Sequence, residues 1–208
     1  MSTDIDNLTI DALKEISNIA AGHLSEVISQ LTRKELSISV PSAEIVNISN
    51  ILINAGATGA PLFVGYTNVF GDVVGSMLCL LSKEDAIKLA ELTLDEEVAP
   101  LLFPSPLEKD ALSELINITS GAYLSSVTQF LGTYLIPQSP VIDVFEAVKL
   151  LNFLEEKTES SEDYENRDIV GVSIKYAVDG EELSGDMLIL VGPNLLDHLS
   201  KKIKEKHI

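Results

Sequence analysis

Apolar residues recur every three or four positions along two stretches of the chain, residues 11–31 and 110–131. This spacing predicts two amphipathic helices, each of which buries one face. Two more helices are expected, one at 83–94 with Ser82 as its N-cap and one at 194–206. In the first helix the face predicted to be buried consists of Leu13, Ile16, Ala20, Leu24, Val27 and Leu31.

Runs of alternating or β-branched residues lie between these helices and predict strands. Two segments are predicted to lack regular structure: a proline-rich linker at 95–106 and an acidic, exposed loop at 155–168. The predicted strands are 36–40, 44–48, 61–66 and 72–81 in the first half, and 140–148, 169–177 and 185–191 in the second.

The two halves of the chain repeat each other. At a constant offset of 99 residues, ten of the 31 positions in 11–41 are identical to those in 110–140, where about two would match by chance. We therefore predict an α+β fold. One domain over residues 1–208 would consist of two duplicated helix–strands–helix halves, about 8–99 and 107–206, related by a pseudo-two-fold axis and sharing one sheet.

The formal net charge of −18, from 32 acidic and 14 basic residues, argues against nucleic acids and anionic membrane surfaces as partners. The charge suits a partner with a basic contact surface, and simple solubility explains it equally well. The single cysteine, Cys79, excludes an intramolecular disulfide and is expected in the core. The polar, acidic N-terminus and the lack of an apolar run of about 20 residues predict a cytoplasmic protein.

Four polar or small residues of the first helix, Asp11, Glu15, Asn18 and Gly22, fall within about 60° of one another at 100° per residue. The second helix repeats this stripe with Asp110, Glu114, Asn117 and Gly121. An N-cap or an ordinary solvated face would explain one copy, but recurrence at fixed spacing favours a functional site. A glycine inside a helix costs about 1 kcal/mol relative to alanine, so its recurrence indicates close approach by another molecule.

The pattern Asp-x3-Glu-x2-Asn-x22-Pro, which ends at Pro41 in the first copy and at Pro140 in the second, resembles the signature of the CheC, CheX and FliY phosphatases. The resemblance covers nearly the whole chain, and two intact copies are typical of the CheC branch. The flanks differ from the Asn-Ile-Gly-Ala-Gly-Asn that is common in the family. Here they are Asn18-Ile-Ala-Ala-Gly-His23 and Asn117-Ile-Thr-Ser-Gly-Ala122.

The resemblance implies a phosphatase that acts on the aspartyl phosphate of a CheY-type response regulator. The regulator would bring its own Mg²⁺ and lysine, so no metal or cofactor is expected on this chain. By resemblance, Asn18 and Asn117 would orient the attacking water, and Glu15 and Glu114 would pair with the lysine. The remaining signature residues, Asp11, Asp110, Pro41 and Pro140, would shape the site, and Gly22 and Gly121 would let the regulator approach.

A non-catalytic reading of the same fold stays open. Switch proteins such as FliM share the architecture without the catalytic pair, so the chain could serve as a chemotaxis adaptor. CheC-type proteins also resemble partners of the CheD deamidase, and a CheD-binding module is a further alternative. His23, His198 and His207 lack the spacing of metal ligands.

Overall fold

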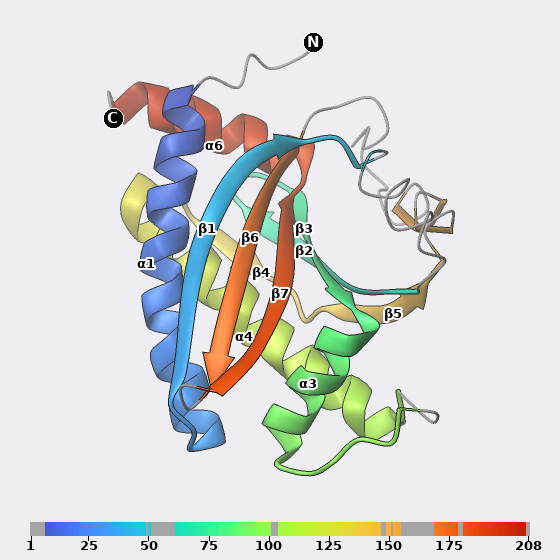
Figure 1. Cartoon of the computed structure of the whole chain (residues 1–208). Helices are drawn as coiled ribbons and strands as arrows, with labels where there is room; N and C mark the ends of the chain where they lie inside the picture. The colour runs from blue at the N-terminus through green and yellow to red at the C-terminus, as the bar shows by residue number, and fades with distance from the viewer. Residues whose placement is uncertain are drawn as a thin grey trace.

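The computed structural model describes residues 7–48, 50, 61–100, 104–146, 149–150, 152–154, 169–178 and 181–206. A seven-stranded sheet, antiparallel at each described pairing, runs through the molecule (Figure 1). Its strands are β1 (Leu36–Val46), β2 (Leu62–Gly71), β3 (Gly75–Ser82), β4 (Leu135–Pro137), β5 (Val141–Phe145), β6 (Ile169–Val178) and β7 (Glu181–Val191). The prediction that both halves of the chain share one sheet is therefore confirmed.

The strand order is β1-β6-β7-β3-β2-β4, and β5 also pairs with β2. The order reads the same in reverse when β1 is exchanged with β4, β2 with β6 and β3 with β7. The halves meet at the centre, where Met77–Leu81 of β3 pairs with Met187–Val191 of β7. The order agrees with the predicted duplication, which stays an interpretation of the sequence.

Several strands differ from their predicted bounds. The predicted strands 36–40 and 44–48 merge into a single strand, β1, which ends two residues early at Val46 and has a register shift between Ser39 and Ser42. Pro41 lies in this irregularity, where a residue without a backbone N–H is tolerated. Residues 72–74 belong to the turn before β3, and β4 was not predicted at all. The predicted 155–168 loop lies outside the described residues.

The helices are α1 (Asn7–Thr32), α3 (Lys83–Leu94), α4 (Pro106–Leu131) and α6 (Pro193–Lys206). The bounds of α3 are confirmed, and Ser82 caps it by accepting a hydrogen bond from the backbone N–H of Asp85. α4 begins four residues earlier than predicted because Ser105 and Glu108 form a capping box before it. Among the described residues, no helix is long and apolar enough to cross a membrane.

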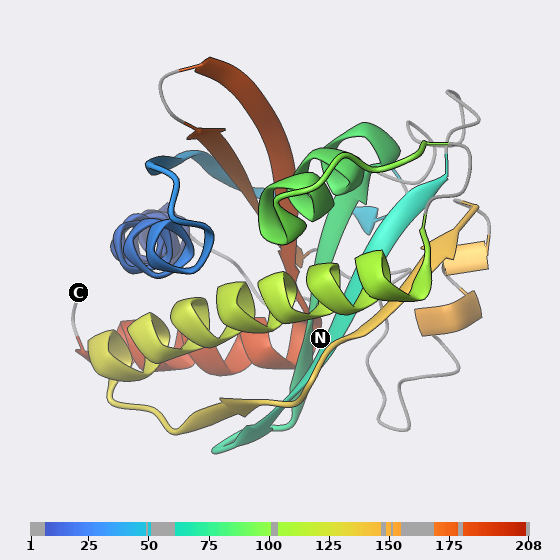
Figure 2. The same cartoon turned by 90° about the horizontal axis from the view of Figure 1, so that it is seen from below.

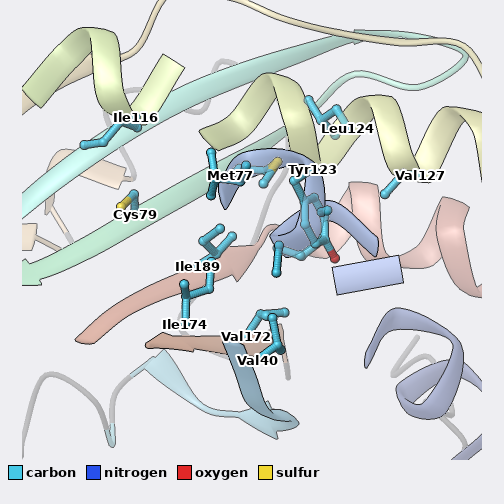
Figure 3. Close-up of a cluster of buried hydrophobic side chains, with 14 of the residues drawn as sticks. Val40, Met77, Cys79, Ile116, Tyr123, Leu124, Val127, Val172, Ile174 and Ile189 are labelled. Carbon is cyan, nitrogen blue, oxygen red and sulfur yellow. The ribbon is translucent and has the colours of Figure 1, made fainter. Parts of the chain in front are cut away.

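All four of these helices contribute to one core against the same face of the sheet. Figure 2 shows α1 end-on and α4 running across the view, so the two helices cross. Figure 3 shows the ring of Tyr123 pointing from α4 into this core, with Ile174 and Ile189 from the strands below. A second, smaller cluster, which includes Leu78 and Leu190, covers part of the other face.

Leu13, Ile16, Ala20 and Leu24 of α1 are buried as predicted, but Val27 is 44% exposed. The core position near the end of α1 is Ile28 instead, which is 4% exposed. Ile28 follows Leu24 at a spacing of four, so the buried stripe continues through Ile28 and leaves Val27 at its margin. The side chain of Leu31 lies outside what the structure describes.

Candidate functional site

The signature residues of the first copy form an open stripe on α1. Asp11, Glu15, Asn18 and Gly22 are all exposed, while their neighbours Leu13 and Ile16 are fully buried. The predicted division of the helix into a core face and a polar face is therefore confirmed. Glu15 and Asn18 are three residues apart, so their side chains project from adjacent turns of one face.

The stripe recurs on α4 with a different degree of exposure. Asp110 and Glu114 are exposed, whereas Asn117 and Gly121 are only half-exposed. The adjoining Leu112, Leu115 and Ile116 are buried to 2% exposure or less. Both helices therefore place a glutamate and an asparagine at the surface, and the α1 pair is the more open of the two.

The polar side chains of both stripes take no part in holding the fold together. Within the described part of the chain, Asp11, Glu15, Asn18, Asp110, Glu114 and Asn117 make no side-chain hydrogen bond or ion pair. The N-cap alternative is wrong for Asp11, because α1 begins at Asn7 and Asp11 lies inside the helix. A solvated face and a partner-binding face both remain compatible with this arrangement.

The two glycines of the stripes are not required by internal packing. A Cβ atom built on Gly22 or on Gly121 would meet no other atom within 4 Å. Neither glycine has a positive φ, since both lie inside helices. Glycine lowers helix stability by about 1 kcal/mol relative to alanine. Since alanine would fit at both positions, the glycines are better explained by the close approach of another molecule than by packing within this chain.

The side chains of the α1 stripe are exposed, and those of the α4 stripe are exposed or half-exposed. A small cavity lies on the opposite, inner side of the helices, where α1 and α4 meet the sheet. Its lining is mostly apolar and consists of Ser17, Ala20, Ala21, Leu24, Thr119, Tyr123, Ile174 and Ile189. The Glu/Asn pairs do not line it, so the site is an exposed helix face, which suits a macromolecular partner better than a small substrate.

Pro140 lies next to the site helix, between β4 and β5, and is buried. Its carbonyl oxygen accepts a hydrogen bond of 3.5 Å from Oγ of Ser113, the residue before Glu114. The structure thus brings the second signature proline to α4. The side chain of Pro41 lies outside what the structure describes, so its predicted role in shaping the site stays a prediction.

Gly65 of β2 fixes the depth of α4 on the sheet, and sequence reasoning missed it. A Cβ atom at this position would lie 2.7 Å from Cδ1 of Ile116, closer than packed atoms come. Ile116 directly precedes Asn117, so this contact sets the height of the second stripe above the sheet. No local pattern marks Gly65, because its constraint comes from a helix 51 residues further along the chain.

Two comparisons of sequence show what the chain is similar to. Residues 8–49, which include α1 and its stripe, match the model of the CheC-like family. A relative, the CheY-P phosphatase CheC of Bacillus subtilis (strain 168), is 27% identical over 186 residues, covering 87% of each chain. The chain is thus similar to the CheC-like family over α1 and is distantly related to a CheC phosphatase over most of its length.

Several solved structures resemble the fold of this chain. FliY of Thermotoga maritima has a TM-score of 0.78 at 17% identity, covering 98% of this chain and 100% of that one. The middle domain of FliM from H. pylori has a TM-score of 0.69 at 11% identity, covering 95% and 99%. CheX in the CheX–CheY–BeF3–Mg²⁺ complex from Borrelia burgdorferi reaches 0.52 at 13% identity, covering 88% and 97%. These likenesses concern the fold alone.

The remaining candidate groups fall outside the stripes. Cys79 is buried in β3 as predicted, and burial raises the pKa of its thiol to about 12. His198, on α6, lies 2.8 Å from the hydroxyl of Thr133, in the segment after α4. In the part of the chain that the structure describes, no three His, Cys, Asp or Glu side chains come together as metal ligands would.

Proposed function

We propose that this CheC-like chain is a phosphatase that hydrolyses the aspartyl phosphate of a CheY-type response regulator. One observation carries the proposal. The Glu15/Asn18 pair recurs as Glu114/Asn117 on a second open helix face, and these side chains bind no described residue of their own chain. The named activity of the Bacillus subtilis relative on CheY-P supports the choice of substrate.

In the proposed reaction the oxygen of a water molecule forms a bond to phosphorus as the bond from phosphorus to the aspartyl oxygen breaks. The products are inorganic phosphate, the free carboxylate of the regulator and one proton, which passes to solvent. Asn18 and Asn117 would hold this water in line, because a carboxamide both accepts and donates hydrogen bonds. Positioning suffices for a loose phosphoryl-transfer transition state, where little covalent assistance is needed.

The glutamates would fix the docking geometry. Glu15 and Glu114 are exposed carboxylates one turn from the asparagines, so each can pair with a lysine of the regulator while its asparagine faces the phosphate. The open space at Gly22 and Gly121 would let the regulator's backbone come close to the helix. The metal in this scheme is Mg²⁺ on the regulator, and the chain would supply no cofactor of its own.

The test is the decay of a phosphorylated CheY-type regulator with and without the protein. The wild type is expected to accelerate decay, and Asn18→Ala combined with Asn117→Ala is expected to return it to the regulator's own rate. Glu15→Gln and Glu114→Gln should raise KM more than they lower kcat, because they weaken docking rather than the alignment of water. Unchanged acceleration by the double asparagine variant would overturn the assignment of both sites.

A non-catalytic role is the alternative outcome. The fold alone is compatible with it, because the FliM middle domain has the same architecture. A protein that binds the phosphorylated regulator, or CheD, without accelerating decay would be an adaptor. Binding measured on the same samples, by titration calorimetry for example, separates this outcome from a failure to recognise the chosen regulator.

A further inference from the structure

One residue that flanks the asparagine differs in charge between α1 and α4. Lys14 of α1 corresponds, at the offset of 99, to Ser113 of α4. At 100° per residue Lys14 lies about 40° from Asn18, on the side opposite Glu15. Asn18 therefore lies between a cation and an anion on α1, whereas Asn117 has only the anion of Glu114 beside it.

Lys14 is exposed and is not used by the fold. Within the described residues it forms no ion pair or hydrogen bond, although the chain holds 32 acidic residues. Most other described lysines are engaged. Ion pairs join Lys34 to Asp95, Lys88 to Glu84, Lys109 to Asp143, Lys149 to Glu146, and Lys201 and Lys202 to Glu205.

Ser113 cannot replace this charge. It is half-buried, and its hydroxyl donates to the carbonyl oxygen of Pro140. Asn117 is also less exposed than Asn18. The α4 site thus combines a more restricted asparagine with a neutral, internally bonded neighbour, and the α1 site combines an open asparagine with an unpaired ammonium group.

Geometry favours a contact between Lys14 and a group held against Asn18. Residues four apart on a helix have Cβ atoms about 5–6 Å apart, and helical side chains lean towards the N-terminus, so Asn18 leans over the turn of Lys14. The flexible ammonium stem of a lysine can reach a phosphate as a point charge. It would also offset the repulsion that a chain of net charge −18 exerts on a phosphoryl dianion.

We propose that Lys14 contacts the phosphoryl group of the regulator and makes the α1 site the more active of the two. The inference rests on the proposed phosphatase function and adds that the two sites are unequal in activity. Lys14 acts by charge and moves no proton. Its contribution should therefore fall as ionic strength rises.

Single-site proteins provide the test. Asn117→Ala leaves only the α1 site and Asn18→Ala leaves only the α4 site, so the first is expected to be the faster phosphatase. Adding Lys14→Ser to Asn117→Ala should lower kcat/KM by about threefold to tenfold at low salt, and Lys14→Arg should restore most of the loss. The effect of Lys14→Ser should be larger in the Asn117→Ala protein than in the Asn18→Ala protein.

A matched control removes an equal charge elsewhere. Lys201→Ser on α6, whose side chain is exposed, should leave kcat/KM in the Asn117→Ala protein unchanged. An unaltered rate in Lys14→Ser, or equal losses in both single-site proteins, would overturn the role of Lys14 while leaving the phosphatase assignment intact. If the wild type accelerated no decay, the proposed function and this inference would both fall.

Discussion

Thr133 Oγ1 lies 2.8 Å from Nε2 of His198, and this contact joins the loop after α4 to α6. The same hydroxyl lies 3.1 Å from Oδ2 of Asp72 in the turn between β2 and β3, to which it donates. Because the hydroxyl proton points to the carboxylate, the histidine nitrogen is the donor to the hydroxyl oxygen. One hydroxyl thus ties together three segments that are distant in sequence.

This junction predicts a loss of stability on mild acidification. Burial, followed by the nearby charge of Lys202, lowers the pKa of His198 from its ordinary 6.5, against the opposing pull of Asp72. The unfolded chain then binds a proton more readily than the folded one, so the contribution of His198 is lost as pH falls through about 6.5. Urea unfolding should be measured at about pH 7.5 and about pH 5.5. Between these two pH values the free energy of unfolding should fall less for His198→Asn than for the wild type. Equal declines would show that His198 does not carry the effect.

Asp72 predicts a second loss of stability, at a more acidic pH. The backbone N–H of Tyr134 and then the Thr133 hydroxyl hold the pKa of this carboxyl below its ordinary 3.8. A carboxyl with a lowered folded pKa stabilises the protein above 3.8, and that contribution is lost as pH falls through the folded value. Asp72→Asn should therefore lower the urea midpoint at neutral pH and flatten its dependence on pH below about 4. A neutral midpoint equal to that of the wild type would contradict the prediction.

The parts of the site that could be predicted are those fixed within one helix. Helical periodicity separates Leu13 and Ile16 from Glu15 and Asn18, and the structure places these pairs on opposite faces. Recurrence at a fixed offset then singles out the polar positions, because solvated faces otherwise vary freely in sequence. The start of α3 is likewise set by local sequence, because Ser82 caps the helix.

The parts that could not be predicted depend on contacts across the sheet. The three-residue strand β4 exists because Leu135–Pro137 pairs with residues 69–71 of β2, and its own sequence is too short to show alternation. The close contact of Gly65 with Ile116 and the Thr133–His198 bond are long-range for the same reason. The lower exposure of Asn117 relative to Asn18 likewise depends on the surroundings of each helix and not on the shared motif.

The thiol of Cys79 is predicted to be unreactive in the folded protein. It is 4% exposed, and burial raises the pKa of its thiol to about 12, so almost no thiolate exists at neutral pH. A thiol-reactive disulfide reagent should modify it only at the rate of unfolding, and about 6 M guanidinium chloride should expose it fully. Rapid modification under native conditions would place Cys79 at the surface, in conflict with its position in β3.

Asn18→Ala and Asn117→Ala are expected to leave the fold intact. Neither side chain bonds to a described residue, and alanine has the higher helix propensity, so each change should alter the free energy of unfolding by about 0.5 kcal/mol or less, in the stabilising direction. Denaturant melts followed by circular dichroism test this expectation. A destabilised or unfolded variant would mean that the asparagines are structural and that loss of phosphatase activity says nothing about catalysis.

Substitution of Gly22 or Gly121 by alanine should raise stability and weaken the activity. Each lies inside a helix, and an added Cβ meets nothing within 4 Å, so Gly22→Ala and Gly121→Ala should each stabilise the fold by about 1 kcal/mol. The same methyl group would stand where the regulator is proposed to approach the helix. KM for the phosphorylated regulator should therefore rise in these more stable proteins.

Gly65→Ala is the matched control for these substitutions. Its Cβ would lie 2.7 Å from Ile116 Cδ1 inside the core, so the same chemical change should destabilise the fold by about 1–3 kcal/mol. Thermal melts and decay assays on all three variants distinguish the two kinds of glycine. If Gly22→Ala and Gly121→Ala were stabilised and kept full activity, the partner would not approach the helix backbone there, and the glycines would need another explanation.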